Sequence, residues 1–351
     1  MYDIILSFIT AFLLTYLAIP SIIHVATKKN LVDEPGERRS HSVSTPSLGG
    51  IGIFAGVIFS IILWTPFRYF GDLQYILCSF IIIFLIGAKD DIDPISPSKK
   101  FAGELFAAFI LVFIAKIKIT SFYGIFNIWE IPEMFSYGFS IFTIIVIINA
   151  FNLIDGINGL SGSVGVLICF TFGVWFLMID KVELAIVAFA TAGSVIAFLN
   201  YNITPARIFM GDTGSLLLGL VCSILAIQFI ELNNSLDKSA FTIGSAPSVA
   251  IGIMIIPLFD TLRVFVLRIS KGKSPFSPDR NHIHHLLLDA GLNHMQSTSV
   301  LVFVNAIFIL IAVYLQHLGT EWLLFILISI ALFLTAILLL INSKKGIPSK
   351  V

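Results

Sequence analysis

The sequence predicts an all-α protein that crosses a membrane many times. Of its 351 residues, 57% are hydrophobic and only 12% are charged, and the mean hydropathy is +0.99. Soluble domains carry about 25% charged residues, and here the apolar residues form long blocks instead of periodic stripes. The formal net charge is zero, so no overall field would attract a nucleic acid, and we expect no such partner. The composition therefore excludes a soluble domain, a disordered chain and a disulfide scaffold, and we interpret the three cysteines as inert packing residues.

A membrane-spanning helix needs about 20 mostly apolar residues, and eleven blocks of the chain approach that length. They lie near residues 3–24, 49–67, 74–88, 101–116, 136–150, 161–179, 183–200, 214–231, 248–267, 298–315 and 321–342. The first block has neither a basic start nor a small-residue cleavage site, so we expect a retained helix and not a cleaved signal peptide. The sequence thus predicts one transmembrane domain over residues 1–351 with about eleven helices.

Lysine and arginine favour cytoplasmic loops, and they define the orientation. With the N-terminus outside and the C-terminus in the cytoplasm, 16 of the 21 Lys and Arg residues fall on the cytoplasmic side. Every cluster of polar residues that looks functional falls on that side too, although those clusters played no part in choosing the orientation. We therefore expect the active site to be built from the cytoplasmic loops 25–48, 88–100, 150–160, 200–213 and 268–297.

Carboxylates stand where two of the expected helices end or begin. Asp90 and Asp91 directly follow the third block, and on a helix their side chains would point about 100° apart, toward two different partners. Negative charge is unfavourable at a helix C-terminus, so a cation or a cationic side chain would offset it; the alternative is a solvated helix end. Asp212 stands at the start of the eighth block, where it would either hold a cation or cap the helix.

Two further segments are rich in groups that suit phosphates. Residues 149–160 contain six Asn, Asp and Gly residues within eleven positions, more than a simple turn needs, and exposed backbone N–H groups there would suit an anion. Residues 279–285 hold Arg280 and three histidines, with Asp260 and Arg263 at the inner end of the ninth block. A zinc site is one alternative for these histidines, although no cysteine accompanies them, and a solvated loop is the other. Carboxylates for Mg²⁺, basic donors for phosphates and apolar walls for a lipid predict phosphoryl transfer between a soluble nucleotide and a membrane lipid.

Five of these motifs, in this order, resemble those of the polyprenyl-phosphate N-acetylhexosamine-1-phosphate transferases. They are residues 46–50 (Pro-Ser-Leu-Gly-Gly), Asp90-Asp91, residues 149–160, residues 209–215 and the His-Ile-His-His motif at 282–285. Residues 279–285 are similar to the branch that transfers N-acetylglucosamine-1-phosphate to undecaprenyl phosphate, whereas the peptidoglycan translocases carry three consecutive histidines. The resemblance implies about eleven helices and a cytoplasmic active site.

The resemblance also implies a role for each matching residue. Asp212 and Asn152 would ligate Mg²⁺, with Mn²⁺ as the alternative cofactor, and Asp90 and Asp91 would be the catalytic residues beside the reacting phosphates. The uridine and diphosphate would be bound by Phe209, Asp155, Asn158 and Asn202, and the phosphate and sugar by Arg280, His282, His284, His285 and His41. Many relatives have Asp where this chain has Asn158, and the amide lacks the charge that a base or a principal metal ligand needs.

The activity implied by the resemblance is transfer of a sugar-1-phosphate from a UDP-sugar to undecaprenyl phosphate, with release of UMP, in the bacterial inner membrane. The sugar expected is N-acetylglucosamine, with another N-acetylhexosamine as the alternative, and a homodimer is expected because relatives often form one. We favour direct attack of the lipid phosphate, oriented or deprotonated by Asp90, over a covalent aspartyl intermediate. A transporter is less favoured, because it would place its acids near mid-membrane and often shows internal repeats. Here the acids lie at the ends of the expected helices, and no repeat is visible in the sequence. A CDP-alcohol phosphotransferase would have Asp-Gly-x-x-Ala-Arg, which residues 155–160 lack.

Overall fold

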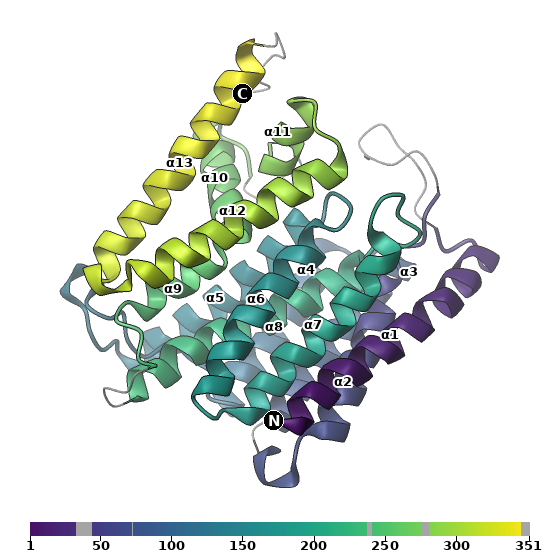
Figure 1. Ribbon diagram of the computed structural model, residues 1–351, viewed down its shortest axis with the longest axis horizontal. Coiled ribbons are helices and arrows are strands. Elements are labelled where there is room, and N and C mark those ends of the chain that lie inside the picture. The colour runs from purple at the N-terminus through teal and green to yellow at the C-terminus, as the bar shows by residue number, and fades with distance from the viewer. Residues whose placement is uncertain (33–43, 72, 237–240, 275–280, 345–351) are drawn as a thin grey trace.

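The computed structural model describes residues 1–32, 44–71, 73–236, 241–274 and 281–344, which form a bundle of α-helices (Figure 1). Within these residues thirteen α-helices follow one another, which confirms the all-α prediction. They are α1 Tyr2–Lys28, α2 Gly49–Trp64, α3 Leu73–Ile92, α4 Pro97–Phe109, α5 Glu133–Ile154, α6 Leu160–Met178, α7 Val182–Asn202, α8 Gly211–Ser235, α9 Ala246–Ile253, α10 Ile255–Ser270, α11 Ile283–Asp289, α12 His294–Tyr314 and α13 Thr320–Lys344. A π-helical turn over Ile110–Ile114 continues α4.

The chain is a multi-pass membrane protein. Each of the eleven apolar blocks contains a helix or, in one case, two successive helices. By length and composition, seven of the described helices could cross a membrane, and the bent pair α9–α10 would make eight. Helix α2, with 16 residues, is shorter than a usual span of about 20 residues. The count of eleven spans and the orientation stay predictions.

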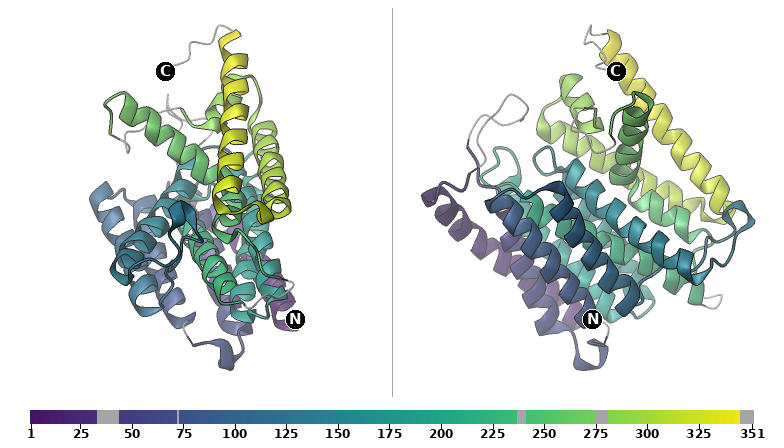
Figure 2. Two further views of the ribbon diagram at one scale, coloured as in Figure 1. Left: turned by 90° about the vertical axis from the view of Figure 1, so that its left-hand side faces the viewer. Right: turned by 180° about the vertical axis from the view of Figure 1, so that it is seen from behind.

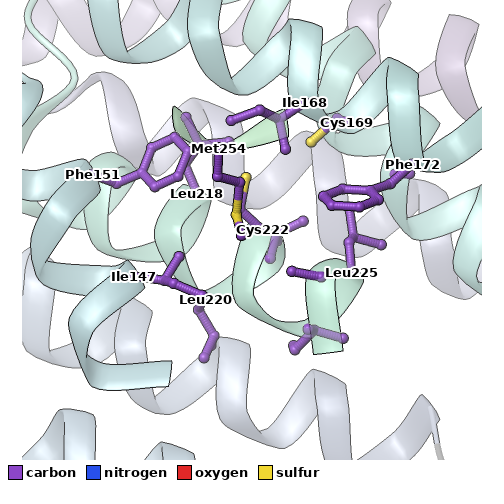
Figure 3. Close-up of a cluster of buried hydrophobic side chains, with 14 of the residues drawn as sticks. Ile147, Phe151, Ile168, Cys169, Phe172, Leu218, Leu220, Cys222, Leu225 and Met254 are labelled. Atoms are coloured by element: carbon purple, nitrogen blue, oxygen red, sulfur yellow. The ribbon is translucent and has the colours of Figure 1, made fainter. Parts of the chain in front are cut away.

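Helix α8 runs through the middle of the bundle. Of its most apolar stretch 83% is buried, whereas the corresponding stretch of α13 is 17% buried. Side chains of α5 and α6, among them Phe151 and Phe172, pack against side chains of α8 such as Leu218 (Figure 3). Because such packing leaves little free space, the surrounding helices fix the position of the first turn of α8.

Two of the three cysteines belong to this core. Cys169 and Cys222 are fully buried in it, as expected of packing residues (Figure 3). The expectation is wrong for Cys78, whose side chain is exposed on α3. An apolar block in a membrane protein faces lipid as well as protein, so apolar neighbours in the sequence do not predict burial.

The ninth apolar block is broken, and not the single helix that its length predicts. Helices α9 and α10 meet at an angle of 85°, and α10 leaves the rest of the bundle (Figure 2). Pro257 has no N–H to donate to the carbonyl of Ile253, four residues earlier. The buried amide of Asn305 on α12 takes its place, because its Nδ2 donates to the Ile253 oxygen at 3.0 Å and its Oδ1 accepts from the Ile256 N–H at 3.3 Å. Asn305 therefore satisfies the backbone groups that the break would leave unpaired.

The loops on the site side are shorter than the sequence predicts. Helix α3 continues to Ile92, α5 to Ile154 and α7 to Asn202, and α11 forms within the segment expected as the loop 268–297. The polar residues at these ends find partners on neighbouring helices and loops, so they do not terminate the helix that carries them. Asp90, Asp91 and Asn152 consequently lie in last helical turns and not in loops.

Candidate active site

The predicted polar residues converge where α3, α5 and α7 end and α4, α6 and α8 begin. At the first turn of α8, the Asp91 carboxylate accepts hydrogen bonds from the backbone N–H groups of Asp212 and Thr213, at 2.7 and 2.9 Å, and from the Thr213 hydroxyl at 2.5 Å. N–H groups in the first turn of a helix have no partner within the helix, and a carboxylate suits them well. Asp91, and not Asp212, therefore caps α8.

The Pro-Ser-Leu-Gly-Gly motif holds the segment before α8 from the other side. The Pro46 carbonyl accepts from the Phe209 N–H at 2.7 Å, and the Gly49 N–H donates to the Phe209 carbonyl at 3.0 Å. A Cβ atom at Gly50 would lie 2.2 Å from the backbone nitrogen of Gly214, so only glycine allows α2 to approach α8 this closely. Phe209, which we expect at the uracil, is half-buried beside this contact.

The Asp212 side chain is free of capping and faces a lysine. One of its oxygens pairs with the Lys100 ammonium and the other accepts from the Asn152 Nδ2 at 2.8 Å. The same ammonium lies 3.4 Å from an Asp90 oxygen, and the second Asp90 oxygen accepts from the Ile95 N–H at 2.8 Å. Asp90 and Asp91 thus have different partners, as their positions on the helix predict, and Lys100 is the cationic side chain that offsets the acids.

A buried glutamate lies one helical turn beyond this lysine. Glu104 is 2% exposed and accepts from the Asn149 Nδ2 at 2.6 Å. Sequence reasoning missed both Lys100 and Glu104, because Lys100 served only to orient the chain and Glu104 lies inside an apolar block. An ionisable residue inside such a block is itself a signal of function, so Glu104 could have been found.

The segment rich in Asn, Asp and Gly, residues 149–160, runs from the last turns of α5 to the first residue of α6. Asp155 accepts a hydrogen bond from Ser161, and burial raises the pKa of Asp155 to about 7, with the charges of Asp212 and Asp91 acting in the same direction. Asn202 links two loops, since its Oδ1 accepts from the Gly159 N–H at 2.7 Å and its Nδ2 donates to the Ile208 carbonyl at 2.9 Å.

The amide of Asn158 is also engaged within the protein. Its Nδ2 donates to the Thr204 hydroxyl at 3.0 Å. The hydrogen bonds of Asn158 and Asn202 give both amides a part in ordering the loops, and contact of either with uridine stays a prediction.

The histidine motif reaches this segment from α11. His282 and His284 are buried, with stacked rings whose centroids are 5.7 Å apart, and His285 lies next to them, half-buried. The backbone of Gly156 touches the His284 ring so closely that a Cβ there would lie 2.5 Å from Nε2. Burial lowers the pKa of His284 to about 3, so its ring is neutral at pH 7, and neither ring nitrogen has a hydrogen-bond partner among the described residues. Arg280 and His41 lie outside the described residues.

Comparison with known proteins connects this geometry to a family. Residues 73–230 match the family described as glycosyl transferase family 4. The chain is 32% identical over 334 residues to the undecaprenyl-phosphate alpha-N-acetylglucosaminyl 1-phosphate transferase of Salmonella typhi, covering 93% of this chain and 88% of that protein. The chain belongs to glycosyl transferase family 4. It is also 32% identical to the protein of the same name from Escherichia coli K12, over 93% of this chain and 88% of that protein. The identity is again 32% with the probable undecaprenyl-phosphate N-acetylglucosaminyl 1-phosphate transferase of Bacillus subtilis 168, over 96% of this chain and 92% of that protein.

The donor atoms of this family 4 transferase fit a hard divalent cation. Asp212 and Asp90 bring carboxylate oxygens from two helices to one lysine ammonium, and Asn152 adds an amide beside them. Mg²⁺ prefers oxygen ligands and takes only one or two protein carboxylates, leaving water and substrate phosphate to complete its shell. Within the described part of the chain no three His, Cys, Asp or Glu side chains come together as a ligand set, so the substrate would supply the remaining ligands. The prediction of Mg²⁺ is therefore compatible with this geometry and stays a prediction.

Proposed function

We propose that this protein transfers N-acetylglucosamine-1-phosphate from UDP-N-acetylglucosamine to undecaprenyl phosphate in the bacterial inner membrane, releasing UMP. The observation that carries this proposal is the 32% identity, over 93% of the chain, to proteins named for transfer to undecaprenyl phosphate. Acids and a lysine gathered at one end of a membrane bundle support it, because a soluble nucleotide and a lipid phosphate can both reach such a position.

In the mechanism that we favour, the chain binds and positions two phosphates. An oxygen of the lipid phosphate attacks the β-phosphorus of the UDP-sugar, the bond from that phosphorus to the bridging oxygen breaks, and UMP leaves with that oxygen. Lys100 binds the diphosphate, and Asp90 orients the lipid phosphate and accepts its proton where it carries one. Bound at Asp212 and Asn152, Mg²⁺ would supply the charge neutralisation on which phosphoryl transfer depends.

The remaining residues hold this arrangement in place or bind other parts of the UDP-sugar. Asp91 fixes the first turn of α8 and with it the Asp212 carboxylate. His284 is neutral and can donate from one ring nitrogen and accept at the other, which suits sugar hydroxyl groups. We assign the phosphate and sugar also to His282, His285, Arg280 and His41. We assign uridine and the diphosphate to Phe209, Asp155, Asn158 and Asn202.

A transfer assay with purified protein tests the proposal. The protein in detergent receives undecaprenyl phosphate, Mg²⁺ and radiolabelled UDP-N-acetylglucosamine, and we expect lipid-extractable label and UMP to appear together. EDTA and Asp212→Ala should abolish both, whereas the control Asp93→Asn should change neither, because the Asp93 side chain is 70% exposed. Product from only another UDP-sugar would correct the sugar, and no product from any UDP-sugar would refute the function. Net retention of configuration at phosphorus would refute direct attack in favour of a covalent intermediate.

A further inference from the structure

A buried polar cluster on α10 contacts the histidine motif and has no part in the mechanism above. Asp260 is 2% exposed, and its Oδ1 accepts from Arg263 at 2.9 Å and from the backbone N–H of Ile283 at 3.0 Å. Its Oδ2 lies 2.9 Å from the Nδ1 atom of His282. Arg263 also donates to the carbonyl of Asn281. Two residues of α10 thus bind the chain just where α11 begins.

The contact between Asp260 and His282 determines which ring nitrogen carries a hydrogen. A carboxylate can only accept hydrogen bonds, and the guanidinium group and the backbone N–H on the other oxygen favour its ionised form. The His282 Nδ1 must therefore donate to Asp260, so it carries a hydrogen. In the neutral ring the other nitrogen, Nε2, is then an acceptor.

A purely structural role would not need a buried charge at this place. Apolar side chains of similar volume usually stabilise a protein as well as a buried ion pair does, because they require no desolvation of charge. By contrast, a carboxylate that orients a histidine fixes both its ring position and its tautomer, which matters where the ring contacts a substrate. The His282 ring has no second hydrogen bond among the described residues, and it stacks on the neutral ring of His284.

We propose that Asp260 is a positioning residue of the transferase: it holds His282 with the hydrogen on Nδ1, so that Nε2 accepts a hydrogen bond from a hydroxyl group of the donor sugar. This inference rests on the proposed function. The sugar, and not the diphosphate, is the assigned partner of His282 because Lys100, placed at the diphosphate, stands with Asp90 and Asp212. The His282 ring instead stacks on His284, which contacts the backbone of Gly156.

The variant Asp260→Asn reverses the tautomer and keeps the attachment of α11. The amide oxygen of Asn would stay where Arg263 and the Ile283 N–H donate, which places its NH₂ group against the His282 Nδ1. That nitrogen must then accept, and the hydrogen moves to Nε2. Replacing the orienting Asp of a catalytic triad by Asn imposes the wrong tautomer in the same way.

The test combines a spectrum with ligand binding, using the full-length protein in detergent at pH 8. Nitrogen-15 spectra of histidine-labelled protein, assigned with His282→Gln, should show a protonated Nδ1 in the wild type and an unprotonated Nδ1 in Asp260→Asn. The affinity for UDP-N-acetylglucosamine should fall about tenfold, the effect of one lost hydrogen bond. The affinity for UDP, which has no sugar, should change less than about twofold, and this binding also shows that the variant is folded.

Two further variants keep the proposal open to refutation. The control Asp289→Asn, which removes an exposed carboxylate at the far end of α11, should leave both the spectrum and the affinities unchanged. His282→Gln should lose the same tenfold in sugar-nucleotide affinity, and adding Asp260→Asn to it should cost nothing more, because both changes remove one interaction.

Several results would overturn the inference. These are a His282 Nδ1 that stays protonated in Asp260→Asn, a reversed tautomer with unchanged UDP-sugar affinity, an equal loss of UDP affinity, or wild-type affinity in His282→Gln. If the wild-type protein transfers no sugar phosphate at all, the proposed function fails. The spectrum needs no substrate and would still decide whether Asp260 sets the tautomer.

Discussion

Replacing Asp91 by Asn distinguishes a residue that holds α8 from one that reacts. The Asp91 oxygens accept three hydrogen bonds from Asp212 and Thr213, at 2.5 to 2.9 Å. An amide has only one acceptor oxygen, so its NH₂ group would face at least one of those donors whichever way it turned. An unpaired buried donor costs about 1–3 kcal/mol, and losing negative charge at a helix N-terminus costs about 0.3–1 kcal/mol more. We therefore expect Asp91→Asn to lower the free energy of unfolding by about 2–3 kcal/mol.

Unfolding in detergent, followed by tryptophan fluorescence, measures this change beside the transfer assay. We expect the stability and the transfer rate of Asp91→Asn to fall together, because the weakened turn carries Asp212. The control is Asp93→Asn at the same helix end, whose exposed side chain pairs with Lys89 and should contribute little to stability, because an exposed ion pair is screened by solvent. If Asp91→Asn unfolds like the wild type but has lost transfer, the capping argument is wrong and Asp91 belongs with the reacting groups.

Three other substitutions test separate parts of the structure. Gly156→Ala should weaken UDP-sugar binding, because its methyl group would lie 2.5 Å from the His284 ring, and such overpacking costs about 1–3 kcal/mol. The control Gly138→Ala adds its methyl group in open space and should leave UDP-sugar binding unchanged. The raised pKa of Asp155, about 7, gives a contribution to stability that is complete below pH ~4 and lost as the pH rises through about 7. In denaturant titrations the free energy of unfolding of Asp155→Asn should therefore rise relative to that of the wild type between pH 5 and pH 8, by at most about 3 kcal/mol, and parallel curves would contradict the burial argument. Asn305→Leu leaves a carbonyl unpaired at the break before α10 and should lower stability by about 1–3 kcal/mol; a wild-type unfolding curve would show that the break needs no such partner.

Much of the architecture can be predicted from the sequence, because the bilayer imposes a length and a composition on each span. All eleven apolar blocks contain helices, and the motifs placed on one side by the Lys and Arg distribution do come together. The break at α10 is different, since Pro257 signals it locally but its partner Asn305 lies 48 residues further along the chain.

The chemistry of the site is harder to read from one chain. The cap on α8 could not be predicted because Asp91 and Asp212 are 121 residues apart, and the local sequence offered only Asp212 as a possible cap, beside its possible role in holding a cation. Lys100 and Asp260 were visible as charged residues, but their partners are set by helix packing. A sequence therefore identifies which side chains are unusual in a membrane. Which of them caps a helix, pairs with an acid or orients a histidine depends on the distances between their atoms in the folded protein.

The glycines around the start of α8 have a consequence for motion. A Cβ at Gly50 or Gly87 would lie 2.2 and 2.5 Å from the backbone of α8, so the main chains of α2, α3 and α8 are in direct contact there. Helices in such contact cannot slide past one another without steric overlap, so the carboxylates that they carry form a rigid frame. Closure around a substrate would then come from α10 and α11, which stand at the edge of the bundle (Figures 1 and 2). Hydrogen–deuterium exchange should accordingly change on UDP-sugar binding in α11 and hardly at all in the first turn of α8.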